Sequence, residues 1–257
     1  MTRQIDFSHY STLHVGPVLE VEIIDSPAWD KPGYFIIGAA SNLLVTGQTT
    51  KLAKLSKDFD YIRIDDGRLV VGAATSSGKL LSFVRKHNIA NLEFLSKLPG
   101  NVGGMVKMNA GLKEWEIFNH LISIKTNRGE FQKNEIPHRY RHTEIDGVIQ
   151  EATFEIQTGF SEERFEMFMK MRENQPPEPS AGSCFKNPLP HFAAKLIEDA
   201  GLKGCRIGNM AFSAKHANFL VNLGGGTPED ALALIEKAKN EVLRRFNVQL
   251  EEEIIII

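Results

Sequence analysis

Apolar residues recur along this chain with two different periods, and the period separates predicted strands from predicted helices. Alternating or short continuous apolar runs, typical of strands, occupy 18–24, 34–37, 61–64, 69–71, 121–124, 152–156 and 218–222. Two of these runs flank Asp65-Asp66-Gly67, whose composition favours a tight hairpin turn. The four isoleucines 254–257 predict a further strand, which we expect to be buried.

Apolar residues spaced three and four apart predict four helices. These helices cover 76–87, 161–174, 192–200 and 227–245. Ser161 and Thr227 are typical N-cap residues, and Gly201 is a typical residue for closing a helix. Prolines at 176, 177 and 179 would stop the second helix and mark a domain boundary.

Two loops rich in small residues are candidates for holding a phosphate-bearing ligand. The first runs from Gly38 to Asn42, directly after a predicted strand, and the second runs from Leu98 to Gly104. Small side chains let backbone N–H groups approach an anion closely. The first loop alone is better interpreted as an ordinary turn, whereas the two loops together fit a ligand of dinucleotide size. A third cluster, 224–226, needs only to give freedom to the loop before a helix.

The stretch from Ser180 to Pro188, SAGSCFKNP, shows neither strand nor helix period and is predicted to be a loop. Its hydroxyl, ammonium and amide groups suit a polar site. A hydrolase nucleophile at Ser183 is disfavoured because the surrounding residues do not form GxSxG. Cys184 is better interpreted as a small buried apolar residue than as a reactive thiol.

Two histidines, His138 and His142, flank an arginine-bearing segment. Their spacing is that of metal ligands on a helix, but Pro137 precedes them and no glutamate lies between them as in HExxH. We therefore expect no metal site. An arginine cluster that binds phosphate or carboxylate fits these residues better, and ordinary solvated charge is the alternative.

Composition excludes several classes of protein. The chain has 257 residues, 42% of them hydrophobic, and a net charge of −2, so neither nucleic acid nor an anionic membrane is an expected partner. No signal peptide or membrane span is visible. Two cysteines without a CxxC pair indicate a cytoplasmic protein with reduced thiols. The even charge is compatible with a monomer.

Taken in order, five stretches resemble motifs of the UDP-N-acetylenolpyruvoylglucosamine reductase (MurB) family. The resemblance covers about Ser11 to Glu253. The matching stretches are GAASNLL at 38–44, PGNVGG at 99–104 with NAG at 109–111, Tyr140-Arg141, SAGSCFKNP at 180–188 and LEEEI at 250–254. Single matches of this length are weak, whereas the ordered set is specific.

The resemblance implies an α+β fold, with an FAD-binding fold of the vanillyl-alcohol-oxidase/MurB type in two subdomains. Residues 1–50, with 247–257, would form the first subdomain, and 51–172 the second. Residues 173–246 would form a smaller α/β substrate-binding domain. The chain has no room for the tyrosine-bearing insertion of longer members, so it resembles the compact subtype.

The same resemblance implies a reaction. NADPH would reduce FAD, and the reduced flavin would reduce UDP-N-acetylglucosamine enolpyruvate to UDP-N-acetylmuramate, a precursor of peptidoglycan. Arg141 and a protonated Glu253 would stabilise charge on the substrate carboxylate, and Ser183 would donate a proton, assisted by Lys186 or by water. The alternatives are another FAD-dependent oxidoreductase of this fold and a flavin- or nucleotide-binding module without catalysis.

Further binding residues follow from the matched motifs and from two further stretches that resemble the family, AGLKG at 200–204 and KHANF at 215–219. The residues expected to bind substrate are Tyr140, Lys186, Asn187 and His216. The residues expected to bind the cofactor are Gly38, Ala39, Ala40, Ser41, Asn42, Pro99, Gly100, Gly103, Gly104, Asn109 and Ala110.

Four departures from the family pattern concern these contacts. Ala40 replaces a glycine, and we expect its methyl group to be accommodated only if φ is negative. Lys97-Leu98 stands where Gly-Ile is usual, Ser11-Thr12-Leu13 where Asn-Thr-Phe is usual, and Ile255 where many members carry arginine. No motif distinguishes NADPH from NADH.

Overall fold

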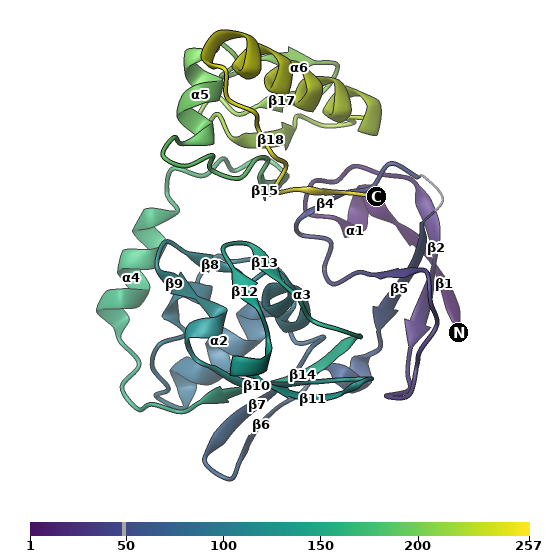
Figure 1. Ribbon diagram of the computed structural model, residues 1–257, viewed down its shortest axis with the longest axis vertical. Helices are drawn as coiled ribbons and strands as arrows, with labels where there is room; N and C mark the ends of the chain where they lie inside the picture. The colour runs from purple at the N-terminus through teal and green to yellow at the C-terminus, as the bar shows by residue number, and fades with distance from the viewer. Residues whose placement is uncertain (48–49) are drawn as a thin grey trace. The chain divides into compact units, whose positions relative to one another are not determined.

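The computed structural model describes residues 1–47 and 50–257, and the chain divides into two compact units (Figure 1). Unit 1 comprises Met1–Arg3, Val21–Ala39 and Lys51–Glu173, and unit 2 comprises Gln4–Glu20, Ala40–Thr50 and Asn174–Ile257. The finer division into two cofactor subdomains and a substrate domain stays a prediction.

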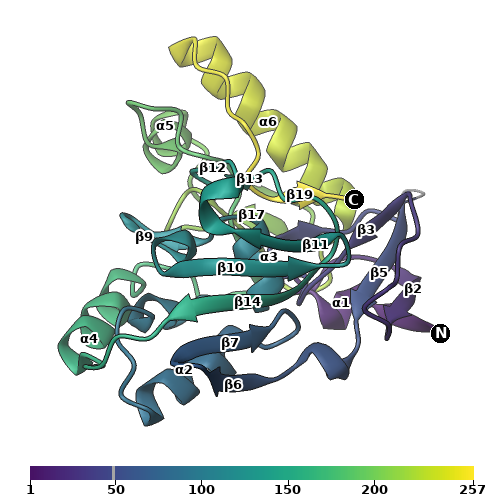
Figure 2. The ribbon, with the colours of Figure 1, turned by 60° about the horizontal axis from the view of Figure 1, so that its bottom comes forward.

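Unit 1 is built on a five-stranded antiparallel sheet in the order β11-β10-β14-β7-β6 (Figure 2). The strands are β6 Ile62–Asp65, β7 Arg68–Gly72, β10 Leu121–Thr126, β11 Gly129–Gln132 and β14 Ile149–Glu155. The helices of this unit are α2 Ser77–Lys86, α3 Val102–Lys107 and α4 Glu162–Met171. Short 3-10 helices cover Lys57–Phe59 (η1), Glu93–Leu95 (η2), Ile117–Asn119 (η3) and Lys133–Glu135 (η4).

The core of unit 1 follows from the alternation of its strands and the spacing of its helices. Leu80 and Val84, four residues apart on α2, are fully buried in the same cluster as Phe154 of β14 and Phe168 of α4. Fully burying one such side chain contributes about 1.5–3 kcal/mol. Ser76 caps α2 by accepting a hydrogen bond from the backbone N–H of Lys79 at 3.2 Å.

A second sheet has the order β1-β2-β5-β3. Its strands are β1 Thr2–Asp6, β2 Val18–Ile24, β3 Tyr34–Ile36 and β5 Lys51–Leu55. Both β2 and β3 pair with β5 in parallel. The first loop of small residues follows β3 directly, as the sequence predicts. Two hairpins complete unit 1, formed by β8 Gly111–Leu112 with β9 Trp115–Glu116 and by β12 His138–Arg139 with β13 His142–Thr143.

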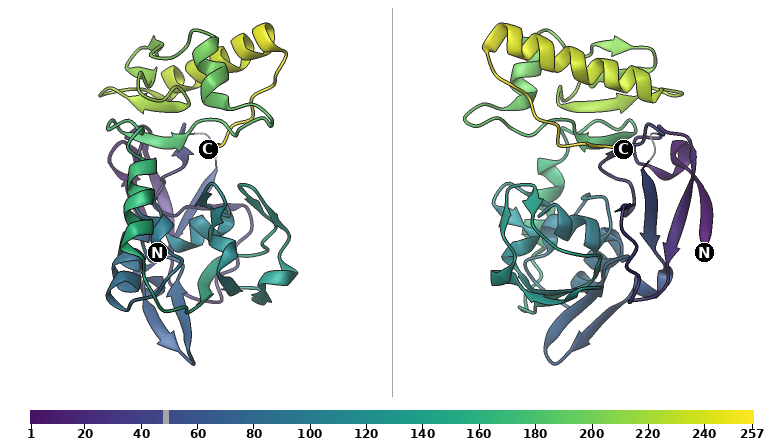
Figure 3. Two further views of the ribbon diagram at one scale, coloured as in Figure 1. Left: turned by 90° about the vertical axis from the view of Figure 1, so that its left-hand side faces the viewer. Right: turned by 45° about the vertical axis from the view of Figure 1, so that its right-hand side comes forward.

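Unit 2 contains an antiparallel sheet in the order β15-β18-β17-β16, with a long helix beside it (Figure 3, yellow helix and green strands). The elements are α1 Phe7–Tyr10, β4 Leu43–Leu44, β15 Ser180–Ser183, α5 Ala193–Asp199, β16 Arg206–Ile207, β17 Met210–Phe212, β18 Phe219–Asn222, α6 Pro228–Phe246 and β19 Ile255–Ile256. Buried Leu234, Ile235, Ala238 and Val242 form the inner face of α6.

The four predicted helices are confirmed, with caps at Ser161 and Thr227. Gly201 follows α5 in a left-handed conformation with φ of 76°, as its predicted closing role requires. None of the helices in the described ranges is long and apolar enough to cross a membrane.

Three local predictions are wrong. Residues Ser180–Ser183 form strand β15 rather than a loop, because a register shift at this strand hides its period. Helix α4 ends at Met171, five positions before Pro176, with Arg172 as its C-cap. The isoleucine strand is only partly buried, since Ile254 is 3% exposed but Ile256 is 38% exposed.

Candidate functional site

Within unit 1, Gly38 of the first loop of small residues lies beside Asn101 of the second. A Cβ atom built on Gly38 would lie 3.7 Å from the Cβ atom of Asn101. Asn101 precedes α3 and forms an isolated β-bridge with Ser76. The chain therefore brings backbone from 38 and from 99–104 to one place, as a ligand contacting both loops would need.

The two adjacent glycines of α3 have different roles. A Cβ atom on Gly103 would lie 2.9 Å from the Cβ of Ala73, so Gly103 is required by the close packing of α3 against the end of β7. A Cβ atom on Gly104 would meet nothing within 4 Å, and Gly104 is exposed. Bare backbone beside open space at Gly104 fits a large planar cofactor, which a side chain would otherwise keep at a distance.

Two non-glycine residues, one in the first loop and one just before the second, hold backbone conformations typical of glycine. Ala40 has a φ of +50° and Lys97 a φ of +54°. The expectation of a negative φ at Ala40 is therefore wrong. The turn keeps its left-handed geometry although the residue carries a methyl group, and that conformation costs an L-residue roughly 1–2 kcal/mol.

Asn42 connects the first loop to the C-terminal segment. The side-chain amide of Asn42 donates to the backbone carbonyl of Glu253 at 2.9 Å, and the backbone carbonyl of Asn42 accepts from Ile255 N at 3.0 Å. Strand β19 continues this contact by pairing in parallel with β4. One side of the Glu253 backbone is thereby fixed within unit 2.

The opposite side of this segment contacts the chain just after β15. The carbonyl of Cys184 accepts from Glu253 N at 2.8 Å, and Lys186 N donates to the carbonyl of Glu251 at 2.9 Å. Ser183 and Glu253 therefore lie on neighbouring segments of unit 2. The structure brings these two predicted catalytic residues together.

Asn218 holds the turn after β15 in place, and sequence reasoning did not single it out. It is 4% exposed, and its side chain accepts from Phe185 N at 3.0 Å and donates to Phe185 O at 2.8 Å. The only signal available was the match of Lys215–Phe219 to the family pattern, which names no role for the amide.

Ion pairs surround the Glu251–Glu253 segment. Lys186 forms an ion pair with Glu251, and Lys239 of α6 lies 2.9 Å from Glu252. Cys184 is buried near Glu252 and Glu253. Burial first, and then the nearby carboxylates, raise the pKa of its thiol, so Cys184 stays protonated and serves as a core residue, as predicted.

Two predicted substrate ligands have structural contacts. The side-chain carbonyl of Asn187 accepts from Ala193 N at 3.0 Å and so caps α5, whose own N-cap residue Phe192 makes no side-chain bond. His216 packs edge-on against Phe219, with ring centroids 4.8 Å apart. Burial lowers the pKa of His216, which favours the neutral imidazole.

Arg141 belongs to unit 1, at the turn of the hairpin β12–β13. It has a φ of 56°, and its guanidinium lies 4.8 Å from the ring centroid of Tyr140 and donates through Nη2 to Gly111 O at 3.0 Å. Arg172 lies close enough to interact electrostatically with it. Burial, and secondly the charge of Arg141, lower the pKa of Arg172 to about 10, so Arg172 remains a cation at neutral pH.

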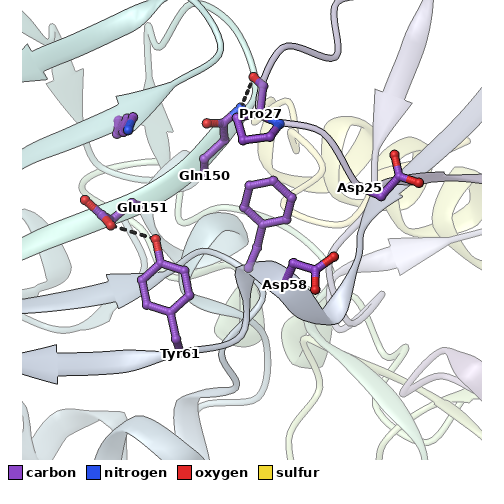
Figure 4. Close-up of a pocket in the computed structure, with 8 residues that line it drawn as sticks. Asp25, Pro27, Asp58, Tyr61, Gln150 and Glu151 are labelled. Carbon is purple, nitrogen blue, oxygen red and sulfur yellow. Dashed lines mark hydrogen bonds between the residues drawn. The ribbon is translucent and has the colours of Figure 1, made fainter.

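One cavity in the structure contains none of the predicted site residues. A cavity of about 180 Å³ in unit 1 is lined by Asp25, Pro27, Asp58, Phe59, Tyr61, Lys125, Gln150 and Glu151 (Figure 4). Tyr61 donates to Glu151 there at 2.6 Å. Among residues 1–47 and 50–257, no group of three His, Cys, Asp or Glu side chains is arranged to hold a metal ion.

Comparisons with known proteins find the same enzyme family for the C-terminal part and for the whole chain. The family model of the UDP-N-acetylenolpyruvoylglucosamine reductase C-terminal domain matches residues 174–257. The UDP-N-acetylenolpyruvoylglucosamine reductase of Helicobacter hepaticus is 45% identical, covering 100% of this chain and 99% of its own. The enzyme of that name from Campylobacter jejuni strain RM1221 is 40% identical, covering 98% and 99%.

A solved structure extends the similarity to the fold. The crystal structure of UDP-N-acetylenolpyruvylglucosamine reductase from Thermus caldophilus superposes with a TM-score of 0.89 at 29% identity, covering 100% of this chain and 98% of that one. The α+β fold class predicted from the sequence is confirmed.

Proposed function

The chain belongs to the UDP-N-acetylenolpyruvoylglucosamine reductase family, and from this premise we propose how its residues carry out the reaction. It is an oxidoreductase that reduces UDP-N-acetylglucosamine enolpyruvate in the synthesis of peptidoglycan precursors. The observation that carries this assignment is 45% identity over the whole chain. The hydrogen bonds that place the segments of Ser183 and Glu253 side by side support it.

We propose FAD as the cofactor and NADPH as the electron donor. FAD, when bound, would supply two-electron redox chemistry that amino-acid side chains lack. The residues that would hold it are those of loops 38–42 and 99–104; Gly38 lies beside Asn101 within unit 1, and Gly104 offers open backbone. NADPH rather than NADH rests on the family alone.

Reduction of the enolpyruvyl double bond moves negative charge into the substrate carboxylate, and two groups are proposed to stabilise it. Arg141 offers a planar cation, already oriented by Gly111 O and Tyr140, that can bind a carboxylate through two parallel hydrogen bonds. Glu253, in its protonated form, would donate a hydrogen bond to the same group. Its backbone is fixed on both sides by Asn42 and Cys184.

Ser183 is proposed to deliver the proton that the α-carbon of the substrate requires. A serine hydroxyl is a weak acid, so a nearby donor has to restore its proton. Lys186 lies three residues away and is paired with Glu251. Tyr140, Lys186, Asn187 and His216 are proposed to bind the sugar and phosphate groups of the substrate.

We further propose that the protein works as a monomer in the cytoplasm. Cys184 and Cys205 are free thiols, as a reducing compartment would keep them. Gel filtration with light scattering tests the monomer, and a mass of twice 28.7 kDa would contradict it.

An anaerobic titration in two steps tests the reaction. The purified protein is loaded with FAD, NADPH is added, and UDP-N-acetylglucosamine enolpyruvate follows. Bleaching of the flavin absorbance by NADPH and its return with the enolpyruvyl sugar is the expected result. Bleaching without return would exclude this substrate, and failure to bind FAD would overturn the cofactor assignment.

A further inference from the structure

We infer that Asn109 is a positioning residue that fixes the Arg141 hairpin through its buried side-chain amide. The inference rests on the proposed function, because that function gives Arg141 its part in substrate reduction. It assigns Asn109 an action through a neighbouring residue, distinct from the cofactor contact that the sequence predicts for it.

The contacts of Asn109 use both ends of its amide. The side chain is 0% exposed. Its Nδ2 donates to Glu116 Oε2 at 2.7 Å and to the backbone carbonyl of Arg139 at 3.4 Å, and its Oδ1 accepts from Phe118 N at 3.4 Å. No other side chain of this size both donates and accepts in this way, and the burial leaves no side-chain surface for a ligand.

The hairpin that carries Arg141 needs external support. Strands β12 and β13 pair over only two residues each, and Arg141 itself has the left-handed φ of 56°. A two-stranded hairpin of this length is at best marginal in water without tertiary contacts. The conformation at Arg141 therefore depends on what the hairpin packs against.

Segment 107–111 supplies that support at three points besides Asn109. Thr143 Oγ1 donates to Lys107 O at 2.7 Å, and Lys107 Nζ donates to Ile145 O at 2.9 Å. Gly111 O accepts from Arg141 Nη2 at 3.0 Å. Asn109 lies between these contacts and adds the bond to Arg139 O, so one short segment holds the hairpin before, at and after Arg141.

Asn109→Asp is the sharpest variant. It keeps the size of the side chain and the acceptor for Phe118 N–H, but it removes both N–H donors and directs a carboxylate at Glu116. The return of flavin absorbance on adding the enolpyruvyl sugar should slow by about tenfold, as expected for losing a hydrogen bond that positions a charged group. Bleaching by NADPH, which does not use Arg141, should stay within about twofold of the unaltered protein.

A swap of the partners provides the rescue. In the double variant Asn109→Asp with Glu116→Gln, the glutamine amide donates to the new carboxylate and the repulsion disappears, while the bond to Arg139 O stays lost, so part of the lost rate should return. Glu116→Gln alone keeps an acceptor and should stay within about twofold. Asn119→Asp is the matched control, because Asn119 is an exposed amide of the same unit that donates to Glu114 O at 2.7 Å.

Hydrogen exchange tests the inference about Asn109 independently of the proposed function. In Asn109→Asp, backbone amides of 138–145 should exchange faster than in the unaltered protein, while those of β14 should not change. If the unaltered protein never reduces the enolpyruvyl sugar, the proposed function fails and this exchange pattern alone decides the inference.

Three results would overturn the inference. They are equal slowing of both half-reactions, no return of rate in the double variant, and unchanged exchange over 138–145. If Asn109→Asp does not fold, Glu116→Ala replaces it, since that variant removes the shorter Nδ2 bond from the other side and should show the same separation of the half-reactions.

Discussion

Lys97 holds a backbone conformation that suits glycine, and its side chain points into solvent. Lys97→Gly should therefore stabilise the protein by about 0.5–1 kcal/mol, because the left-handed strain disappears and no buried contact is lost. The melting temperature should rise by roughly 1–4 °C. Ala40 is a poorer test site, since its buried methyl group contributes packing that glycine would remove.

A matched control for this change is Lys86→Gly, in the last turn of α2, where the exposed lysine has ordinary helical geometry. That variant should lose roughly as much stability as Lys97→Gly gains. Equal losses in both variants, measured by thermal unfolding, would refute the role assigned to the left-handed φ.

Lys186 is the residue whose proposed role can be tested apart from its ion pair. Lys186→Met should slow reduction of the enolpyruvyl sugar by about tenfold or more, because it removes a proton source near Ser183. Stopped-flow absorbance should show reduction of the cofactor by NADPH changed much less. Equal effects on the two half-reactions would rule out the proton role.

Glu251→Gln provides the comparison for Lys186. The carboxylate of Glu251 is 72% exposed, and exposed ion pairs contribute little. This variant keeps the lysine ammonium and should retain most of the activity. A loss as large as that of Lys186→Met would assign the effect to the ion pair instead.

At the scale of elements, helix α6 depends on an N-cap residue that the sequence predicts. Thr227 accepts from Asp230 N at 3.1 Å, and Pro228 occupies the first turn. Thr227→Ala should destabilise the protein by about 1 kcal/mol, which lowers the melting temperature by roughly 2–4 °C. Thr227→Ser keeps the hydroxyl acceptor and should melt close to the unaltered protein, and a similar loss in both would exclude capping as the cause.

Local signals explain which elements could be predicted. Caps at Ser161 and Thr227 bond to residues three positions away, so a short window of sequence contains all the information. Strand β15 was missed because Gly182, with a φ of 78°, interrupts its pairing between Ser180 and Ser183. The alternation of side chains that identifies a strand is lost at such an irregularity.

The sequence predicts which residues belong to the site better than it predicts which groups those residues contact. The motifs identified Asn42, Asn109 and Asn187, but each amide bonds to backbone or side chains of its own fold. Those partners lie 211, 7 and 6 residues away, respectively. No pattern in the sequence shows whether an amide faces a ligand or a neighbouring strand, because that depends on tertiary packing.

At the scale of the whole molecule, residues 254–257 should contribute a large share of the stability of unit 2. Their backbone bonds Asn42, Leu44 and Thr46, and Ile254 is buried. Removing these four residues should cost about 5 kcal/mol, from three or more hydrogen bonds and one buried side chain. Urea unfolding followed by fluorescence measures this loss.

Ile256→Ser is the control for the truncation, because Ile256 lies in the same segment but is 38% exposed. It should unfold at nearly the same urea concentration as the unaltered protein. A truncated chain that does the same would show that the β4–β19 pairing is dispensable.

The bond between Asn42 and Glu253 also sets an order of events during synthesis. Asn42 and Glu253 lie 211 positions apart. Because a ribosome adds about 5–20 residues per second, Glu253 is synthesised roughly 10–40 s after Asn42. For that time β4 has no strand beside it, and the loop that leads into it is held by Thr12, which donates to the carbonyls of Ala40 and Ser41. A nascent chain therefore exposes an unpaired apolar edge at Leu43 and Leu44, which is where binding by a chaperone would be of most use.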